Sequence, residues 1–521
     1  MSFVQNFPFF SIIIAMFSGI ISSVLSGKKA RNVTFGAILI ILILSAGVLH
    51  FCSGQGSYTY MMGHFPAPWG NEIRAGVLEG LTAVFFCLVM LLSVLGGMKH
   101  TEQDIESSKH NLFYIMVDLM LSSLLALIYT NDLFTAYVFV EINTIAGCGL
   151  IMIRQKGRSF GAAIRYMIMS QLGSGLFLIG LTLLYDVTGH LLMSPAKEAV
   201  RAIEAAGSYE IPVLVILAVI SVGLAIKSGL YPFHSWIPDT YGYATPTASA
   251  ILSGLVSKGY IFLLIKIFYR VLGQENVIAS RIVNVLFLFG LAGMIMGSVH
   301  AILEWDTRRM IAYSSVAHIG YIYMGIGLGT QAGMVAAIFH MFTHSATKAL
   351  LFISAVGLYE VSGGKKDFVS LRGAGNRNPL AGVGFTVGAL SMVGFPMLSG
   401  FISKLLFATS ALQSPHKMML TIIGLAVSTI LNAVYFLRLV ITLYARPKRK
   451  GSTGEMNEKK GDIREADKTE NGNAAETLPG KQHISWVLGT AICGFILLNL
   501  FLGMMSQPVV QAIANGLAMF D

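Results

Sequence analysis

Long apolar segments separated by short polar loops dominate the chain. Runs of roughly 17–25 apolar residues can span a bilayer as helices, so the pattern predicts an all-α polytopic membrane protein with about fourteen transmembrane helices. Prolines interrupt the seventh and twelfth segments at Pro232 and Pro396, and both are predicted to be discontinuous helices. The predicted spans lie near 8–27, 33–52, 75–97, 111–129, 132–153, 163–185, 211–231, 246–270, 280–303, 310–329, 331–358, 379–411, 418–444 and 484–505.

The polar loops predict the orientation of these spans. Loops after odd-numbered spans are rich in Lys and Arg, as at 28–31, 154–158 and 308–309, whereas loops after even-numbered spans hold few. The positive-inside rule then places the odd loops in the cytoplasm and both termini outside. The one long polar segment, 445–483, is predicted to be a cytoplasmic linker, and the aromatic loop at 53–74 a structured interfacial cap.

Composition narrows the function. The chain is 55% hydrophobic and 12% charged, which is typical of a membrane protein. The net charge of +10 does not indicate a nucleic-acid partner, because the basic residues flank apolar spans and suit lipid headgroups. The four cysteines lack the spacing of a metal or disulfide site. With no nucleotide loop or nucleophile elbow in the sequence, we predict no cofactor, no metal and no redox chemistry in this chain.

Ionisable residues inside the spans are the candidates for function, because each costs several kcal/mol unless it is neutralised or paired. Lys227 precedes the break at Pro232, and Lys258 lies in the next span. Glu141, in the middle of the fifth span, is the natural partner of Lys227. The alternatives without a functional role are that Glu141 reaches water at a helix end and that Lys258 extends its ammonium to the membrane interface. Lys266 is expected to reach the interface in this way.

The eleventh span adds a titratable row. His340, His344 and Lys348 recur every four residues, which places them on one helical face. Histidine can relay protons near neutral pH; binding of a transition metal is the alternative, although lysine is a poor metal ligand. Lys404 follows the break at Pro396. Asp118, His234 and His318 are predicted auxiliary residues, with a purely structural role open for His318, and no oxygen-rich cluster suited to sodium stands out.

Five stretches carry a family resemblance. They are 227–239 (KSGLYPFHSWIPD), 246–250 (PTASA), 306–315 (DTRRMIAYSS), 344–352 (HSATKALLF) and 394–404 (GFPMLSGFISK). In this order they resemble the proton-translocating antiporter-like family shared by Mrp-type sodium/proton antiporters, membrane-bound hydrogenases and respiratory NADH:quinone oxidoreductase. Within the family the chain looks closest to the D-type component of Mrp antiporters or its hydrogenase counterpart.

The resemblance implies a domain plan and a site. A three-helix segment at 1–110 would precede two inverted five-helix repeats at 111–271 and 280–444, with the linker and a last span at 484–521 following. It also implies a Glu141–Lys227 pair, a central Lys258, the histidine–lysine helix and an exit-side Lys404.

The predicted function is that of a proton-translocating subunit in a multi-subunit complex of a bacterial or archaeal cell membrane. Its partners would be other membrane subunits, lipids, protons and, in an Mrp-type assembly, sodium. A pumping subunit of an NADH:quinone oxidoreductase-type complex is the alternative within the family; whether the chain serves an enzyme depends on such redox partners. A non-conducting structural subunit of the membrane arm and a symporter for an organic solute are the alternatives of other classes.

Overall fold

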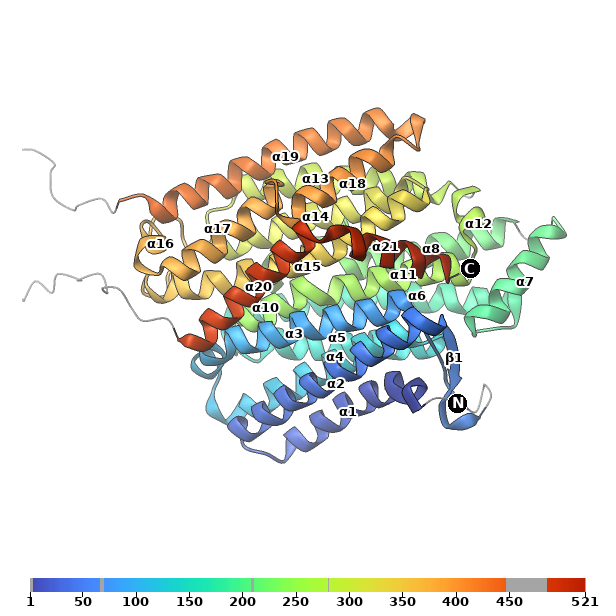
Figure 1. The fold of residues 1–521 in the computed structure, drawn as a ribbon, viewed down its shortest axis with the longest axis horizontal. Helices are drawn as coiled ribbons and strands as arrows, with labels where there is room; N and C mark the ends of the chain where they lie inside the picture. The colour runs from blue at the N-terminus through green and yellow to red at the C-terminus, as the bar shows by residue number, and fades with distance from the viewer. Residues whose placement is uncertain (1–2, 66–69, 208–209, 280, 447–484, 521) are drawn as a thin grey trace, which may run out of the picture.

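The computed structural model describes residues 3–65, 70–207, 210–279, 281–446 and 485–520, and nearly all of them are helical. The long helices run roughly along one direction, with the N-terminal half at the bottom of Figure 1 and the C-terminal half at the top. Helix α20 crosses the front of the N-terminal and C-terminal halves, so the last span packs against helices of both. The long helices are α1 (Phe7–Ser23), α2 (Gly27–Gln55), α3 (Val77–Asp104), α4 (His110–Tyr129), α5 (Leu133–Met152), α6 (Gly157–Thr188), α8 (Glu210–Ser228), α11 (Ser257–Arg270), α13 (Ile282–Leu303), α14 (Thr307–Gly327), α15 (Gln331–Glu360), α17 (Pro379–Val393), α18 (Ser399–Ala411), α19 (Pro415–Tyr444) and α20 (Trp486–Met504).

Twelve helical segments in the described residues are long and apolar enough to cross a membrane. Each coincides with one of the predicted spans. The tenth and twelfth predicted spans correspond to α14, which carries more polar residues, and to the pair α17 and α18. The chain is therefore an all-α, multi-pass membrane protein, while the total of fourteen spans and the two inverted repeats stay predictions.

Shorter elements lie at the ends of the long helices. Strands β1 (Tyr58–Met61) and β2 (Glu72–Ala75) form an antiparallel hairpin within the loop predicted to be an interfacial cap. The segment 484–521 is not one helix, since α20 ends at Met504 and a separate helix, α21 (Ser506–Ala518), packs on α3. The remaining short helices are η1 (Phe3–Asn6), η2 (Met62–His64), η3 (Ser107–Lys109), α7 (Met193–Ala205), α9 (Ile237–Tyr243), α10 (Pro246–Ile251), α12 (Gln274–Ala279) and α16 (Ala374–Arg377).

Both predicted helix breaks are present. Helix α8 ends at Ser228, Gly229 adopts φ +80°, and the chain becomes helical again only at α9, beyond Pro232. Likewise α17 ends at Val393, Gly394 adopts φ +96°, and α18 begins after Pro396. Proline cannot donate the next helical hydrogen bond, and glycine readily adopts the left-handed conformation that ends a helix.

A third irregularity was not predicted. The eighth span contains a π-helical turn, η4 (Leu252–Val256), between α10 and α11. Such turns hold one residue more than an α-helical turn and are frequent at functional sites. In this chain the turn lies immediately before Lys258.

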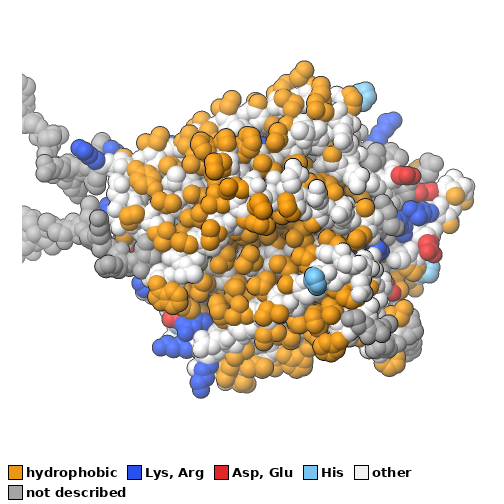
Figure 2. Space-filling model, viewed as in Figure 1, with side chains coloured by type: hydrophobic (Ala, Val, Ile, Leu, Met, Phe, Trp, Pro, Cys, Tyr) orange, Lys and Arg blue, Asp and Glu red, His pale blue; other side chains and the backbone are white. Residues whose placement is uncertain are grey.

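Burial separates an inner set of helices from an outer set. Nearly all residues of Pro246–Arg270 and Gln331–Glu360 are buried by other helices, whereas the other candidate spans bury between 33% and 78% of the residues in their apolar stretch. Hydrophobic side chains cover the middle of the face in Figure 2, and charged ones gather at its two ends. The polar residues of the inner helices are therefore surrounded by protein, and the outer surface is apolar, as a bilayer requires.

The two ends of the chain lie at the same end of the molecule. Helix α1 begins and α21 finishes at one end, and α19 finishes and α20 begins at the opposite end (Figure 1). The predicted linker at 445–483 falls almost wholly outside the described residues. Which end faces the cytoplasm stays a prediction.

Candidate functional site

Six of the predicted ionisable residues form a row that crosses the two enclosed segments and two helices packed against them. Lys227 lies on α8, Lys258 on α11, His340, His344 and Lys348 on α15, and Lys404 on α18. Those on α8, α11 and α15 are at most 1% exposed, and Lys404 is half-buried. We call these residues, with Glu141 on α5, the axial row.

The row begins between α5 and α8. The ammonium of Lys227 donates a hydrogen bond to the Thr144 hydroxyl, one turn beyond Glu141 on α5, and lies 5.2 Å from the ring centroid of Tyr260. Lys227 also belongs to the last turn of α8, where the helix dipole favours a cation. The described residues show no direct ion pair between Lys227 and Glu141, although the two charges interact, and Oε1 of Glu141 lacks a hydrogen-bond partner among them. The Glu141–Lys227 ion pair thus stays a prediction, because in this conformation the Lys227 ammonium donates to Thr144 instead.

A polar bridge supports this part of the row. The Tyr260 hydroxyl donates to Oδ1 of Asn143 at 2.8 Å, and the Asn143 amide donates to the Ser123 hydroxyl at 2.8 Å. This bridge joins α11, α5 and α4 next to Lys227. Uncharged polar residues are common in a sequence and do not stand out as ionisable residues do. The polar bridge was therefore not predicted.

Lys258 depends on the π-helical turn. Its ammonium donates to the main-chain carbonyl of Ser253 within that turn, and the Ser253 hydroxyl lies 3.1 Å from the Ser315 hydroxyl of α14. A π-helical turn weakens the regular hydrogen-bond ladder and so frees a carbonyl for such a contact. The side chain is 0% exposed, so the alternative that Lys258 reaches the membrane interface is wrong.

Three histidines follow Lys258. His318 on α14 stacks on His340 and His344, with ring centroids 5.3 and 5.6 Å apart, and Nδ1 of His318 lies 3.2 Å from Nε2 of His340. Nδ1 of His340 is 2.5 Å from the Ser403 hydroxyl. Neither ring nitrogen of His344 has a hydrogen-bond partner in the described part of the chain. The structure thus brings His318, predicted only as an auxiliary residue, into contact with the row.

The row ends at the second helix break. The Lys404 ammonium donates to the Val393 carbonyl at 2.6 Å and to the Thr429 hydroxyl at 2.9 Å. Val393 is the last residue of α17, so this ammonium, like that of Lys227, lies at the carboxyl end of a broken helix. Lys348 branches off toward α14, where it donates to the Ser314 hydroxyl and, at 3.1 Å, to the Ile311 carbonyl.

Two predicted auxiliary residues lie apart from the row. His234 stacks on Tyr231, with ring centroids 5.2 Å apart, and its ring is tilted against that of His300 at 6.0 Å; His300 in turn stacks on Tyr313. Within the described residues, Asp118 accepts hydrogen bonds from hydroxyls of α1 and α2 alone and makes none with a lysine or with Glu141. The His300 contact was missed, although a histidine late in the ninth span is a visible signal.

The expectation that Lys266 reaches the interface is wrong. Its side chain is 0% exposed, and its ammonium donates to the carbonyls of Leu127, Ile128 and Thr130 at the end of α4. Nearby, Arg270 forms a fully buried ion pair with Glu79.

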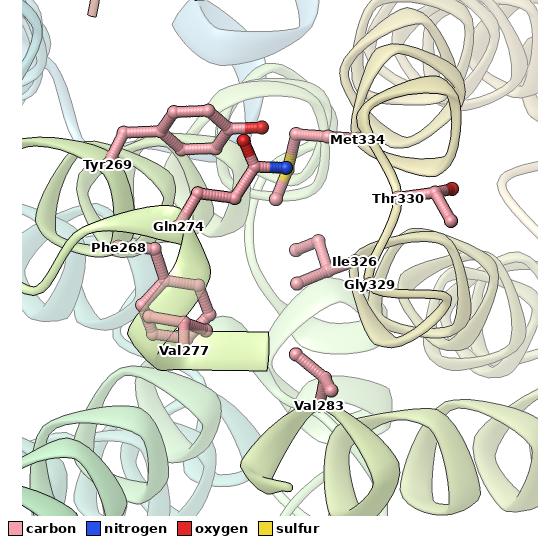
Figure 3. A pocket seen from close by; sticks show the side chains of 9 residues that line it. All are labelled: Phe268, Tyr269, Gln274, Val277, Val283, Ile326, Gly329, Thr330 and Met334. Atoms are coloured by element: carbon pink, nitrogen blue, oxygen red, sulfur yellow. The ribbon is translucent and has the colours of Figure 1, made fainter. Parts of the chain in front are cut away.

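The described residues contain hollows of very different size, one of which, lined in part by Arg31, Phe35 and Trp486, has a volume of about 340 Å³. The one in Figure 3 has a volume of about 20 Å³, room for about one water molecule, and lies between the end of α11 and the start of α15. Gln274 and Thr330 are among its lining residues, and none belongs to the axial row. In the described part of the chain no group of three or more His, Cys, Asp or Glu side chains is arranged to hold a metal ion.

The comparisons with known proteins agree with one another. Residues 130–431 match the family described as "NADH:quinone oxidoreductase/Mrp antiporter, TM". The chain is 32% identical over 454 residues to the N-type component of the NADH-quinone oxidoreductase of Desulforudis audaxviator, covering 85% of this chain and 87% of the relative. It is 26% identical over 369 residues to the D-type component of the Na(+)/H(+) antiporter of Alkalihalophilus pseudofirmus, covering 71% and 72%.

Two solved assemblies contain chains of similar fold. One is the Mrp complex from Dietzia sp. DQ12-45-1b, with a TM-score of 0.85, 24% identity and coverage of 100% of this chain and 98% of that one. The other is the membrane-bound sulfane sulfur reductase, an archaeal respiratory membrane complex, with a TM-score of 0.82, 22% identity and coverage of 99% and 97%. The family match over more than half of its length and the 32% identity to the NADH-quinone oxidoreductase component establish that the chain belongs to the NADH:quinone oxidoreductase/Mrp antiporter transmembrane family.

Proposed function

We propose that this chain moves protons across the membrane, as one subunit of a multi-subunit complex, along the axial row. The observation that carries the proposal is the series of buried and half-buried titratable groups from α5 to α18, which passes both helix breaks. Such residues are rare inside membranes and mark ion pathways and proton relays.

The charges suggest how the relay works. An ammonium that approaches Glu141 is stabilised in its charged form, whereas one that withdraws loses this stabilisation. Withdrawal of Lys227 from Glu141 therefore drives its proton toward Lys258, and renewed pairing reloads it. From Lys258 the stacked histidines, which can accept a proton on one ring nitrogen and release it from the other, lead to Lys404.

The assembly is the second part of the proposal. A D-like component of an Mrp-type cation/proton antiporter or its hydrogenase counterpart is our preferred role, supported by the similarity to the Na(+)/H(+) antiporter component. The similarity to a component of NADH-quinone oxidoreductase supports the alternative, a pumping subunit of an NADH:quinone oxidoreductase-type complex. In either case we propose a bacterial or archaeal cell membrane, both termini outside, the linker in the cytoplasm, and repeats at 111–271 and 280–444.

Proton flux in membrane vesicles that contain the complete complex tests the proton route. Lys227→Ala and Glu141→Ala should abolish flux while the complex still assembles, because the relay loses its entry pair. Lys109→Ala is the matched control, since Lys109 ends the short helix η3 before the fourth predicted span, and its side-chain hydrogen bonds within the described residues go to Glu106 and Gln155. Wild-type flux in assembled Lys227→Ala vesicles would overturn the proposal and leave the non-conducting structural subunit as the better description.

A further inference from the structure

Asp118 is the centre of an unusual cluster outside the axial row. The carboxylate lies on α4, and three hydroxyls converge on it from α1 and α2, which pack against α4. All four side chains are at most 3% exposed. Oδ2 of Asp118 accepts from the hydroxyls of Ser18 at 2.8 Å, Ser22 at 3.4 Å and Thr34 at 2.9 Å. We call these four residues the hydroxyl–carboxylate cluster.

The hydroxyls of the cluster depart from the usual behaviour of helical Ser and Thr. Such side chains commonly donate to the carbonyl four residues earlier in their own helix, as Ser11 does to Phe7 and Thr82 does to Leu78. Ser18, Ser22 and Thr34 turn to Asp118 instead. Three helices thus direct their oxygen atoms to one point in the protein interior.

The hydrogen bonds of the cluster are unevenly shared between the two carboxylate oxygens and do not neutralise the negative charge. A carboxylate oxygen offers about two lone-pair directions, yet three hydroxyls approach Oδ2, while Oδ1 has no hydrogen-bond partner among the described residues. In the same part of the chain no Lys, Arg or His forms an ion pair with Asp118. A buried carboxylate without a compensating positive charge is costly.

A small cation would balance the cluster. Each hydroxyl could turn its proton to the carbonyl four residues earlier, at Ile14, Ser18 and Ala30, and direct its lone pairs inward. The cation would then have the three hydroxyl oxygens and one or both carboxylate oxygens as ligands, and hard cations prefer such oxygen donors. One carboxylate neutralises one positive charge, which favours a monovalent ion over a divalent one.

We propose that the hydroxyl–carboxylate cluster is a binding site for a single sodium ion. It lies about 10 Å from the start of α2, the distance spanned by seven helical residues. It is therefore near the end of the molecule where the basic residues of 28–31, which were predicted to be a loop, form the first turn of α2. The charged side chains closest to the cluster along these helices do not neutralise Asp118. Arg31 pairs with Glu102, and the exposed Lys28 and Lys29 are screened by solvent. The site is separate from the proton route and does not depend on it.

Binding of ²²Na⁺ to the purified complex in potassium buffer tests the proposal. Asp118→Asn keeps the size of the side chain but removes its charge, and should weaken binding at least tenfold. Thr34→Val should weaken it several-fold by removing one ligand. Ser11→Ala is the matched control, because it also deletes a buried hydroxyl of α1 and should leave binding unchanged.

A second readout covers a variant that fails to assemble. Sodium should raise the thermal unfolding temperature of the wild-type complex, since a ligand that binds only the folded state stabilises it, and this gain should shrink in Thr34→Val. Equal ²²Na⁺ binding by wild type and assembled Asp118→Asn would overturn the proposal, as would a wild-type complex that binds none. Lys227→Ala should keep sodium binding, so failure of the proton route and failure of this site give different results.

Discussion

Two lysines on the same helix, α11, show how differently a buried ammonium can be used. Lys258 and Lys266 lie eight residues apart, and both are 0% exposed. Lys266 donates to three main-chain carbonyls at the end of α4, at 3.3, 2.8 and 2.5 Å. Within the described residues the acceptor for Lys258 is the Ser253 carbonyl of its own span, and the nearby His344, whose ring nitrogens have no hydrogen-bond partner there, interacts with it electrostatically.

The difference separates structural lysines from candidate carriers. Lys266 occupies all three of its donors and satisfies carbonyls that the end of a helix leaves without partners. Lys258 has donors to spare and a titratable neighbour, which is what a proton relay requires. Burial of a charge in a membrane protein is thus a weak indicator of transport until its partners are known.

The largest expected effect is on proton flux. Lys258→Met should reduce flux to background in vesicles with an assembled complex, because methionine has a similar shape but carries no proton. Lys266→Met should keep most of the flux per assembled complex, since its ammonium only caps α4. The measurement is proton flux normalised to the amount of assembled complex. Equal losses of flux in the two variants would show that Lys258 and Lys266 do not differ in role.

Stability should show the reverse order. Lys266→Met leaves several carbonyls of α4 without a donor and should lower the free energy of unfolding by about 2 kcal/mol. Lys258→Met removes a poorly compensated buried charge and should be neutral or stabilising. Thermal unfolding of the purified complex measures both effects. A Lys258→Met variant less stable than Lys266→Met would contradict this assignment of roles.

A pH-dependent effect on stability is expected at a lysine outside the membrane spans. Burial, with the neighbouring Arg308 and Arg154, lowers the pKa of Lys366 to about 7 from its usual 10.5. Between these values the unfolded chain binds a proton that the folded chain does not, so this group makes stability rise with pH over that window. Lys366→Gln should flatten the rise seen in thermal unfolding temperatures from pH 7 to 10.

Lys365→Gln provides the matched control for this measurement, because Lys365 is the exposed neighbour in the same loop. It should keep the wild-type slope. A slope that is the same in wild type and Lys366→Gln would show that the environment of Lys366 does not govern the dependence.

Much of the fold could be predicted from the sequence, because each membrane-spanning helix appears as a long apolar segment. The two broken helices followed from Pro232 and Pro396, since proline removes a donor that hydrocarbon cannot replace. The residues of the axial row could be selected one by one because ionisable groups are conspicuous in apolar segments. Lys227, Lys258 and Lys404 needed no structure to be noticed.

What the sequence could not provide is the set of partners. Nothing in the apolar stretch around Lys266 indicates that the carbonyl end of α4 lies beside it, so its expected reach to the interface was wrong. The hydroxyls around Asp118 come from two helices, α1 and α2, that lie up to a hundred residues away in sequence, and serine and threonine are too common to attract attention singly. The π-helical turn before Lys258 contains no proline and left no signal in the hydrophobic pattern.

That turn also sets the rotational phase of the eighth span. One additional residue in a helix rotates everything beyond it by about 100° relative to an uninterrupted α-helix. The face of α10 that carries Ser249 and the face of α11 that carries Lys258 are therefore related by the turn rather than by the regular helical repeat. Removal of Gly254 would restore the regular repeat and swing Lys258 away from its neighbours without altering the lysine itself.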